Sequence, residues 1–496
     1  MHDANPGRAG FFDSDHVRES TTMNRPNPFP IDELPIELLQ EVFSWCLVST
    51  SKSERVYHSI ELQGFTPRTA PLLLCQVSSY WRRVALSFPT LWASLNVYIY
   101  MGRARPSPLL ISRWLARSGS LPLSLALFQQ NESNANQFAA GQILDLFKGY
   151  IHRWCNIQFD FAGPRYCRML PSGRQLSAPM LETFRMHVQE RRHHQEEDAE
   201  DEKDLLEIFD EVPRLSFLHI SRIPALSLAG ESVVPVPWNQ LVSLSLDYVP
   251  SVGTTLLILN KCTYLEECTL KIDSMNGPLA AEIAHPRLAS LSISIGNEQL
   301  ATFLDRLSLP ALKQLVIGVR GPLDPYSWPQ THFEAFLKRS ESRLLRLEMR
   351  DTAIKADEFV ACIQNPFLQS LERIVFEDTR DWTCDPFVTD PAMELLTCAS
   401  FKARAQRRPP SSLSRSERVG SECFLPNLES IKFRGSCLWT ADEALADMVE
   451  SRWRFYCDKV KRLKHVGLEV ISSHVEDVRR LQEFASEGLE LDLMLR

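Results

Sequence analysis

One hydrophobic phrase, Leu-x-x-Leu-x-Leu or a close variant, recurs ten times in the last two thirds of the chain. Alternation of apolar and polar residues puts two large side chains on one face of a short strand, so each copy predicts one strand. Most first leucines follow one another at intervals of 23 to 35 residues, and one interval of 57 indicates a missing copy or an insertion. The copies lie at 179–186, 213–220, 239–246, 263–270, 286–293, 310–317, 342–349, 369–376, 426–433 and 461–468, with a weaker one at 154–159.

Between the phrases, apolar residues recur at steps of three and four, which is the period of an amphipathic helix. The clearest examples are residues 254–262, 299–307, 332–340 and 357–365. A unit of one strand and one helix cannot bury its own apolar face, so such units stack on their neighbours. Intervals of roughly 20–29 residues are typical of leucine-rich repeats. The pattern therefore predicts an α/β fold, a degenerate leucine-rich-repeat-like solenoid of strand–helix units with a curved parallel sheet, over residues 178–496.

Both flanks of the repeats predict further elements. Residues 98–177 are interpreted as irregular early repeats, because 114–128 has the pattern of a helix that runs into a strand. In the last third of the chain, Thr440 and Glu443 have the spacing of a capping box at a helix start. The other elements predicted there are helices over 441–455 and 474–488 and a strand over 489–495.

A second hydrophobic pattern lies near the N-terminus. Pro35 suits a first helical turn, where its missing N–H costs nothing. A second helix is predicted over 70–87 and a short third turn over 89–95, with a polar inserted loop at 49–69. Three short helices cannot bury all their large side chains among themselves, which indicates that a partner completes the core. The wide apolar stripe of the first helix consists of Leu34, Leu38, Leu39, Val42, Phe43, Cys46 and Leu47.

These helices also carry a motif. Leu34-Pro35 is followed by Glu37, Leu38 and Leu39, and then by Val77, Trp81, Pro89 and Leu91-Trp92. With this motif, residues 29–97 resemble an F-box, in the style of the F-box-like proteins of mushroom-forming fungi, in which the loop between the first two helices is long. The resemblance implies a small all-α three-helix domain that docks onto the Skp-type adaptor of a cullin–RING ubiquitin ligase.

The resemblance also implies which side chains make that contact. The candidates on the first helix are Leu34, Pro35, Leu38, Leu39 and Phe43. The positions that match either contact or internal core are Trp81, Leu91 and Trp92. The alternative from the residues themselves is a helical cap on the solenoid.

Composition excludes several other classes of function. The net charge of -8 gives no overall basic field, so a general nucleic-acid binder is disfavoured. The chain has only 19 glycines and no signature of a hydrolase, a zinc protease, a P-loop or a dinucleotide-binding turn, so we expect no enzyme, cofactor or metal site. Twelve cysteines without a C-x-x-C pair indicate buried thiols in a reducing compartment. No apolar stretch is long enough for a membrane span or a secretory signal, which predicts a cytoplasmic or nuclear protein.

Three polar segments interrupt the pattern. Residues 1–28 are expected to be disordered. The acidic segment 189–204 and the basic segment 402–420 are interpreted as charged insertions between repeats. The basic one is either a solvated loop or a tract for nuclear import or phosphorylation. His193 and His194 lie beside acids but lack the ligand spacing of a metal site.

Strand side chains that point away from the core line the concave face of a solenoid, where partners commonly bind. The early strands place small or polar residues there, namely Ser243, Ser245, Asp247, Ser290, Ser292 and Ser294. The later strands place a charged group there, which we expect to bind a protein target: Arg346, Glu348, Arg350, Arg373, Glu377, Lys432 and Arg434. The predicted function is a substrate-recognition adaptor of a Skp–cullin–F-box type ubiquitin ligase. The alternative is an interaction scaffold without a ligase role.

Overall fold

The computed structural model describes a large part of the chain. The described residues are 34–47, 67–163, 177–189, 211–221, 236–273, 281–321, 328–352, 354–378, 386–398, 423–435, 438–454 and 460–495. Several predicted segments lie outside these residues. They are the N-terminal residues 1–28, almost all of both charged insertions with His193-His194, and most of the loop at 49–69.

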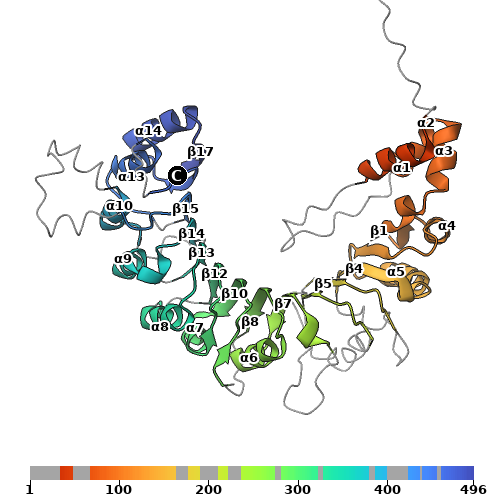
Figure 1. The fold of residues 1–496 in the computed structure, drawn as a ribbon, viewed down its shortest axis with the longest axis horizontal. Coiled ribbons are helices and arrows are strands. Elements are labelled where there is room, and N and C mark those ends of the chain that lie inside the picture. The colour runs from red at the N-terminus through yellow and green to blue at the C-terminus, as the bar shows by residue number, and fades with distance from the viewer. Residues whose placement is uncertain are drawn as a thin grey trace, which may run out of the picture.

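Within these ranges, fifteen strands form one continuous sheet that curves through the whole molecule (Figure 1). Neighbours in the sheet follow chain order, and every pair is parallel except β1 with β2. The strands of the first half are β1 (Ser94–Tyr100), β2 (Arg103–Arg105), β3 (Leu123–Gln129), β4 (Trp154–Phe161), β5 (Thr183–Val188), β6 (Phe217–Ile220), β7 (Ser243–Val249) and β8 (Glu267–Ile272). Those of the second half are β10 (Ser290–Gly296), β12 (Gln314–Arg320), β13 (Arg346–Arg350), β14 (Arg373–Asp378), β15 (Ser430–Gly435), β16 (His465–Val470) and β17 (Glu490–Leu495).

Helices cover the outer, convex side of the sheet and leave the strands on the inner, concave side (Figure 1). The short strands β9 (Ile283–Ala284) and β11 (Leu307–Ser308) pair with each other separately. The helices along the sheet are α4 (Pro108–Arg117), α5 (Asn134–Lys148), α6 (Val252–Lys261), α7 (Asn297–Asp305), α8 (Gln330–Ser340), α9 (Ala356–Gln364), α10 (Asp390–Leu396), α13 (Ala444–Trp453) and α14 (Val475–Ser486). The fold is therefore a mixed α/β, solenoid-like stack of alternating strands and helices.

Each recurring phrase forms one strand of the sheet, as its pattern predicts. The first leucine of every copy is buried at 1% exposure or less, and it closes the turn into its strand. The residue after it donates its N–H to the preceding unit, as in Ala289 to the carbonyl of Glu266 (2.9 Å) and Lys313 to that of Ala289 (2.8 Å). This repeated bond fixes the parallel register, because each unit begins where its neighbour offers a carbonyl.

The 57-residue interval contains an insertion. Arg373 of β14 lies directly opposite Ser430 of β15, so these strands are neighbours and no strand is missing between them. The intervening chain includes α10 and residues 399–422, which the structure does not describe.

Two predictions of helix starts were wrong. The segment 70–87 is not one helix, because Ser78 is extended and accepts the N–H of Trp81, which ends α2 (Leu74–Val77) and begins α3 (Ser79–Leu86). Thr440 and Glu443 do not form a capping box, because Glu443 has a φ of 81° and its side chain caps nothing. Asp442 instead accepts the N–H groups of Glu476 and Asp477 at the start of α14.

The N-terminal helices pack on the first end of the sheet. Pro35 precedes α1 (Ile36–Trp45) as its cap, and its carbonyl accepts the N–H of Leu39 (3.0 Å). The short helix η3 (Pro89–Trp92) runs into β1, and Trp92 meets Trp114 of α4 edge to face at 4.8 Å. The buried side chains of these helices and of the sheet form one hydrophobic core. Within the described residues, each helix is too short or too polar to cross a membrane.

Candidate functional site

One face of α1 is apolar and exposed. Leu38, Val42 and Trp45, at steps of four and three, share that face and are 55%, 41% and 81% exposed. We call these three residues the outer stripe. The indole N–H of Trp45 donates to Glu41 (3.0 Å), so the ring can be covered by a partner without losing its hydrogen bond. Clustered exposure of large apolar side chains is typical of a binding surface.

The neighbouring face of α1 is locked onto the rest of the chain. Leu39 and Phe43 are fully buried, and the ring of Phe43 lies 5.0 Å from that of Trp81. The hydroxyl of Tyr80 on α3 donates to the carbonyl of Leu34 (3.2 Å). Because both the inner face and the start of α1 are held, the outer stripe has a fixed orientation.

The predicted adaptor-contact residues divide into two groups. Leu39, Phe43, Leu91 and Trp92 lie in this chain's own core, at 1% exposure or less, and are core residues rather than contact side chains in this structure. Those that reach the surface are Leu34 and Trp81, both half-buried, and Pro35 and Leu38, both exposed.

Sequence reasoning missed Trp45 and assigned Val42 to the same stripe as the buried residues. The spacing of Leu38, Val42 and Trp45, at steps of four and three residues, could have identified the outer stripe from the sequence. It marks a second helical face beside that of Leu39 and Phe43. Two further apolar residues are exposed: Leu73 just before α2 and Val77 at its end.

The seven predicted target-binding residues lie on the concave side of β13, β14 and β15, and five of them pair with acids or bases nearby. Glu377 forms an ion pair with Arg350 on one side (3.4 Å) and with Lys432 on the other (3.1 Å). The other pairs are Arg350 with Glu348 and Arg434 with Asp492. Exposed pairs of this kind contribute roughly 0–1 kcal/mol each to stability.

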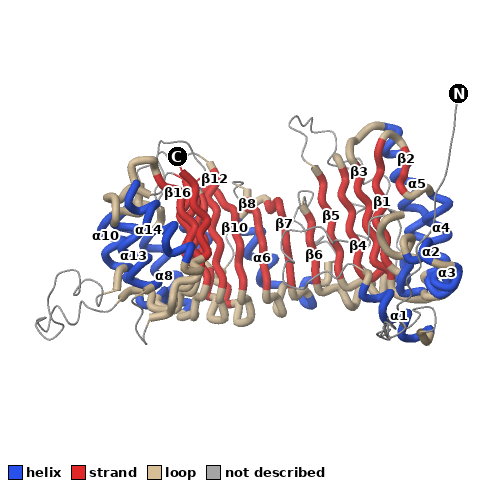
Figure 2. The backbone as a smooth tube through the Cα atoms, turned by 90° about the horizontal axis from the view of Figure 1, so that it is seen from above, coloured by secondary structure: helices blue, strands red, loops and turns tan. Residues whose placement is uncertain are grey.

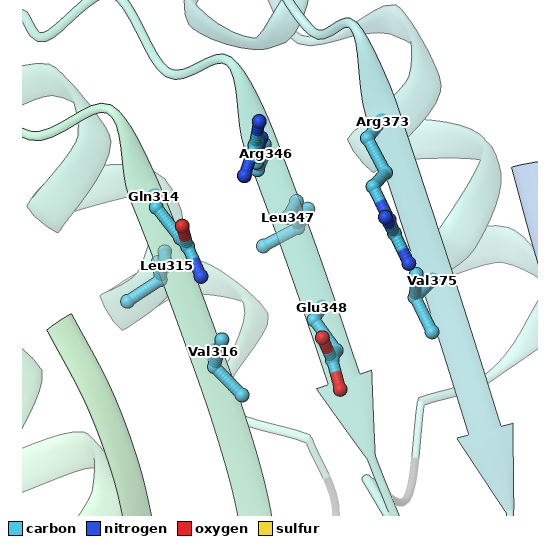
Figure 3. Close-up of a pocket in the computed structure, with 8 residues that line it drawn as sticks. All are labelled: Gln314, Leu315, Val316, Arg346, Leu347, Glu348, Arg373 and Val375. Atoms are coloured by element: carbon cyan, nitrogen blue, oxygen red, sulfur yellow. The ribbon is translucent and has the colours of Figure 1, made fainter. Parts of the chain in front are cut away.

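Arg346 and Arg373 differ from the other five. They lie directly opposite each other on β13 and β14, and neither has an ion pair within the described residues. Figure 3 shows Arg346 between Gln314 of β12 and Arg373, and these side chains line a hollow of about 200 Å³. Like charges directly opposite on neighbouring strands repel each other, so an anion placed between these guanidinium groups would be stabilised.

A second hollow of about 390 Å³ lies next along the concave face. It shares Arg373 with the first and is otherwise of mixed charge, with Lys432 and His465 on one side and Glu490 and Asp492 on the other. The first hollow, by contrast, contains two arginines and one acid, Glu348, which pairs with Arg350.

Described thiols in the core are poorly suited to nucleophilic chemistry. Burial raises the pKa of Cys262 and that of Cys362 to about 12, and burial with the nearby Glu182 raises the pKa of Cys155 to about 11. A thiol with such a pKa holds very little thiolate at neutral pH. These side chains act as small apolar residues of the core.

No family model and no curated protein matches the sequence. Among solved structures, a protein from Bacteroides fragilis, a target of the Northeast Structural Genomics Consortium, is similar over 65% of this chain and 83% of its own length. The identity is 14% and the TM-score is 0.32.

Proposed function

We propose that this chain is a substrate-recognition adaptor of a Skp–cullin–F-box type ubiquitin ligase, with an F-box-like N-terminal domain and a leucine-rich-repeat-like solenoid. The observation that carries the proposal is the outer stripe. It presents three large apolar side chains on a helix whose other face is fixed in the core. A Skp-type adaptor is the occupant that the Leu34-Pro35 to Trp92 motif implies.

The energetics of the outer stripe fit such docking. Fully burying a Leu or Val side chain contributes about 1.5–3 kcal/mol, and Trp is enriched among interface residues that contribute 2 kcal/mol or more. Because α1 is already held by Leu39 and Phe43, little ordering of the helix opposes binding.

The solenoid would hold the target. We propose that an acidic segment of a protein binds the concave face at Arg346 and Arg373, because neither guanidinium group has an ion pair among the residues that the structure describes. Tethering a target beside a ubiquitin-charged enzyme raises its effective concentration, so this chain needs no chemistry of its own.

The docking proposal is tested with the full chain and a purified Skp-type adaptor in a pull-down. Leu38→Asp and Trp45→Asp should each abolish capture, because a carboxylate in the outer stripe would be buried unpaired. Trp439→Asp is the matched control, since Trp439 is 65% exposed but lies between β15 and α13 at the far end of the sheet. Capture by Trp45→Asp equal to that by Trp439→Asp, or no capture by the unchanged chain, would refute docking through α1.

The target surface is tested separately, by crosslinking the full chain to proteins bound in cells. Arg346→Glu with Arg373→Glu should remove the crosslinked target while leaving adaptor capture intact. A target that is retained by this double variant would place recognition elsewhere.

One observation favours the alternative, a scaffold with a helical cap. The N-terminal helices share a continuous core with the sheet, as a cap would. A cap needs its inner face only, so a scaffold predicts that the outer stripe can be made polar without losing any partner of the chain.

A further inference from the structure

Three neighbouring strands bring two histidines and an aspartate together on the concave face. His187 comes from β5, His219 from β6 and Asp247 from β7, which lie side by side in the sheet (Figure 2). One ligand atom of each side chain lies within 4.8 Å of the others. This cluster is far from α1 and from Arg346 in the sequence, and neither proposed binding surface uses it.

The spacing suits a metal ion better than a hydrogen bond. The Nε2 atom of His219 lies 3.9 Å from Oδ2 of Asp247, which is too long for a hydrogen bond. Zinc binds imidazole nitrogen and carboxylate oxygen at roughly 2.0–2.2 Å, so an ion between these two atoms would reach both with little movement. Two imidazoles and one carboxylate are the ligand set of open zinc sites and related transition-metal sites.

The residues around the cluster position its ligands. His219, on the middle strand, is half-buried and lies between His187 and Asp247. His187 is exposed, and Asp160 lies directly opposite it on β4. The Oδ1 atom of Asp160 is buried without a hydrogen-bond partner among the described residues. Such a carboxylate can orient a metal-bound histidine through its second nitrogen.

The charges around the cluster balance before any ion binds. Lys271 lies 3.8 Å from Oδ1 of Asp247, and the guanidinium of Arg185 stacks on the ring of Phe217 at 4.4 Å. Two carboxylates, Asp160 and Asp247, offset these two cations. Lys271 therefore competes with a metal ion for Asp247.

In a second group of similar composition, Asp442, His474 and Asp477, the carboxylates already accept hydrogen bonds. Asp477 accepts from His474 (2.8 Å) and from the N–H of Ala446 (2.7 Å), and Asp442 accepts two N–H groups of α14. Its carboxylates already hold helix ends in place, so this group is structural.

We propose that His187, His219 and Asp247 form a binding site for a divalent transition metal, with zinc as the preferred ion. Three protein ligands leave a further coordination position, and the exposure of His187 places it toward the concave surface. A water molecule or a side chain of a bound partner would complete the coordination.

The test is a titration of the full chain with Co²⁺, followed by its visible absorption and by displacement with Zn²⁺. We expect one equivalent to bind, and His187→Ala and Asp247→Asn each to weaken affinity by about tenfold or more. Because His187 is exposed, His187→Ala should not disturb folding, which circular dichroism checks. Lys271→Met should strengthen binding.

The matched control is His332→Ala. His332 also contacts an aspartate, Asp305 (2.9 Å), but belongs to no three-ligand cluster within the described residues. The His332→Ala variant should bind Co²⁺ with the same affinity as the unchanged chain. Absence of cobalt absorption in the unchanged chain, or equal affinity in His187→Ala and His332→Ala, would overturn the proposal.

Discussion

Arg452 of α13 is a fully buried arginine that joins three segments of the C-terminal stack. Its Nε donates to the carbonyl of Leu396 at the end of α10 (2.7 Å), and its Nη1 donates to that of Leu425 (3.0 Å). Its Nη2 donates to the carbonyl of Phe424 (2.6 Å) and to the Sγ of Cys423 (2.9 Å). The chain returns to the described structure at Cys423, so this arginine fixes both ends of the insertion between β14 and β15.

Arg452→Met keeps most of the volume and removes all four hydrogen bonds. Each hydrogen bond from a charged group to a carbonyl contributes about 1.5–3 kcal/mol, and three carbonyls lose such a bond. The carbonyl of Leu425 keeps the N–H of Leu428, and those of Leu396 and Phe424 keep, within the described residues, only the weak donor Sγ of Cys423. Methionine avoids the cost of burying a charge, which offsets part of the loss. We therefore expect the free energy of unfolding of this region to fall by about 3–5 kcal/mol.

Arg454→Met is the matched control on the same helix. Arg454 is partly exposed and pairs with Glu450 and Glu487, so its loss should cost only about 1 kcal/mol. Native-state hydrogen exchange measures the free energy of local opening in both variants, because units of a solenoid open separately. The affected amides are those of α10, β15 and α13. Equal hydrogen-exchange rates of these amides in the two variants would contradict the role of Arg452 in holding the insertion.

Three further predictions concern the core and its turns. Phe359→Ala should lower the free energy of unfolding by about 3–5 kcal/mol in a urea titration, because this ring packs against three other phenylalanine rings. In the same titration, Gly435→Ala should lower the free energy of unfolding more than Gly488→Ala does. Both glycines have a positive φ, but only at Gly435 would an added Cβ overlap a backbone carbonyl of β14. At pH 8 the native Cys262 thiol should be alkylated about 1,000-fold more slowly than a thiol of ordinary pKa near 9, since its pKa is about 12, with exposed Cys46 as the internal comparison in mass spectrometry.

The repeats could be predicted from sequence because their signal is periodic and local. Ten phrases predicted ten strands in the right order, since an alternating pattern beside a turn-closing leucine admits few other structures. The mixed α/β architecture follows from the same alternation of strand and helix. Periodicity alone could not decide between a missing copy and an insertion at the 57-residue interval, because only the pairing of β14 with β15 shows that they are neighbours.

The helix ends were harder, because the groups that cap them come from elsewhere. The start of α14 is capped by Asp442, which is more than thirty residues away in the sequence, and no local motif marks it. The break at Ser78 depends on one residue taking an extended conformation inside an apolar pattern that continues through it.

The candidate surfaces show the same limit. Alternation placed Arg346 and Arg373 on the concave face, but only the register shows that they lie opposite each other. Likewise, His187 and Asp247 are 60 residues apart in the sequence, and three parallel strands bring them to within a few ångströms of each other. On α1, the sequence pattern does not show which half of a wide apolar stripe faces inward.

Docking through the outer stripe is tested most directly by calorimetric titration of a purified Skp-type adaptor into the full chain at several temperatures. We expect binding with a negative heat-capacity change, because Leu38, Val42 and Trp45 leave water, and about 100-fold weaker binding for Trp45→Asp. Binding that is as tight with Trp45→Asp as with the unchanged chain, or no heat of binding at any temperature, would contradict it.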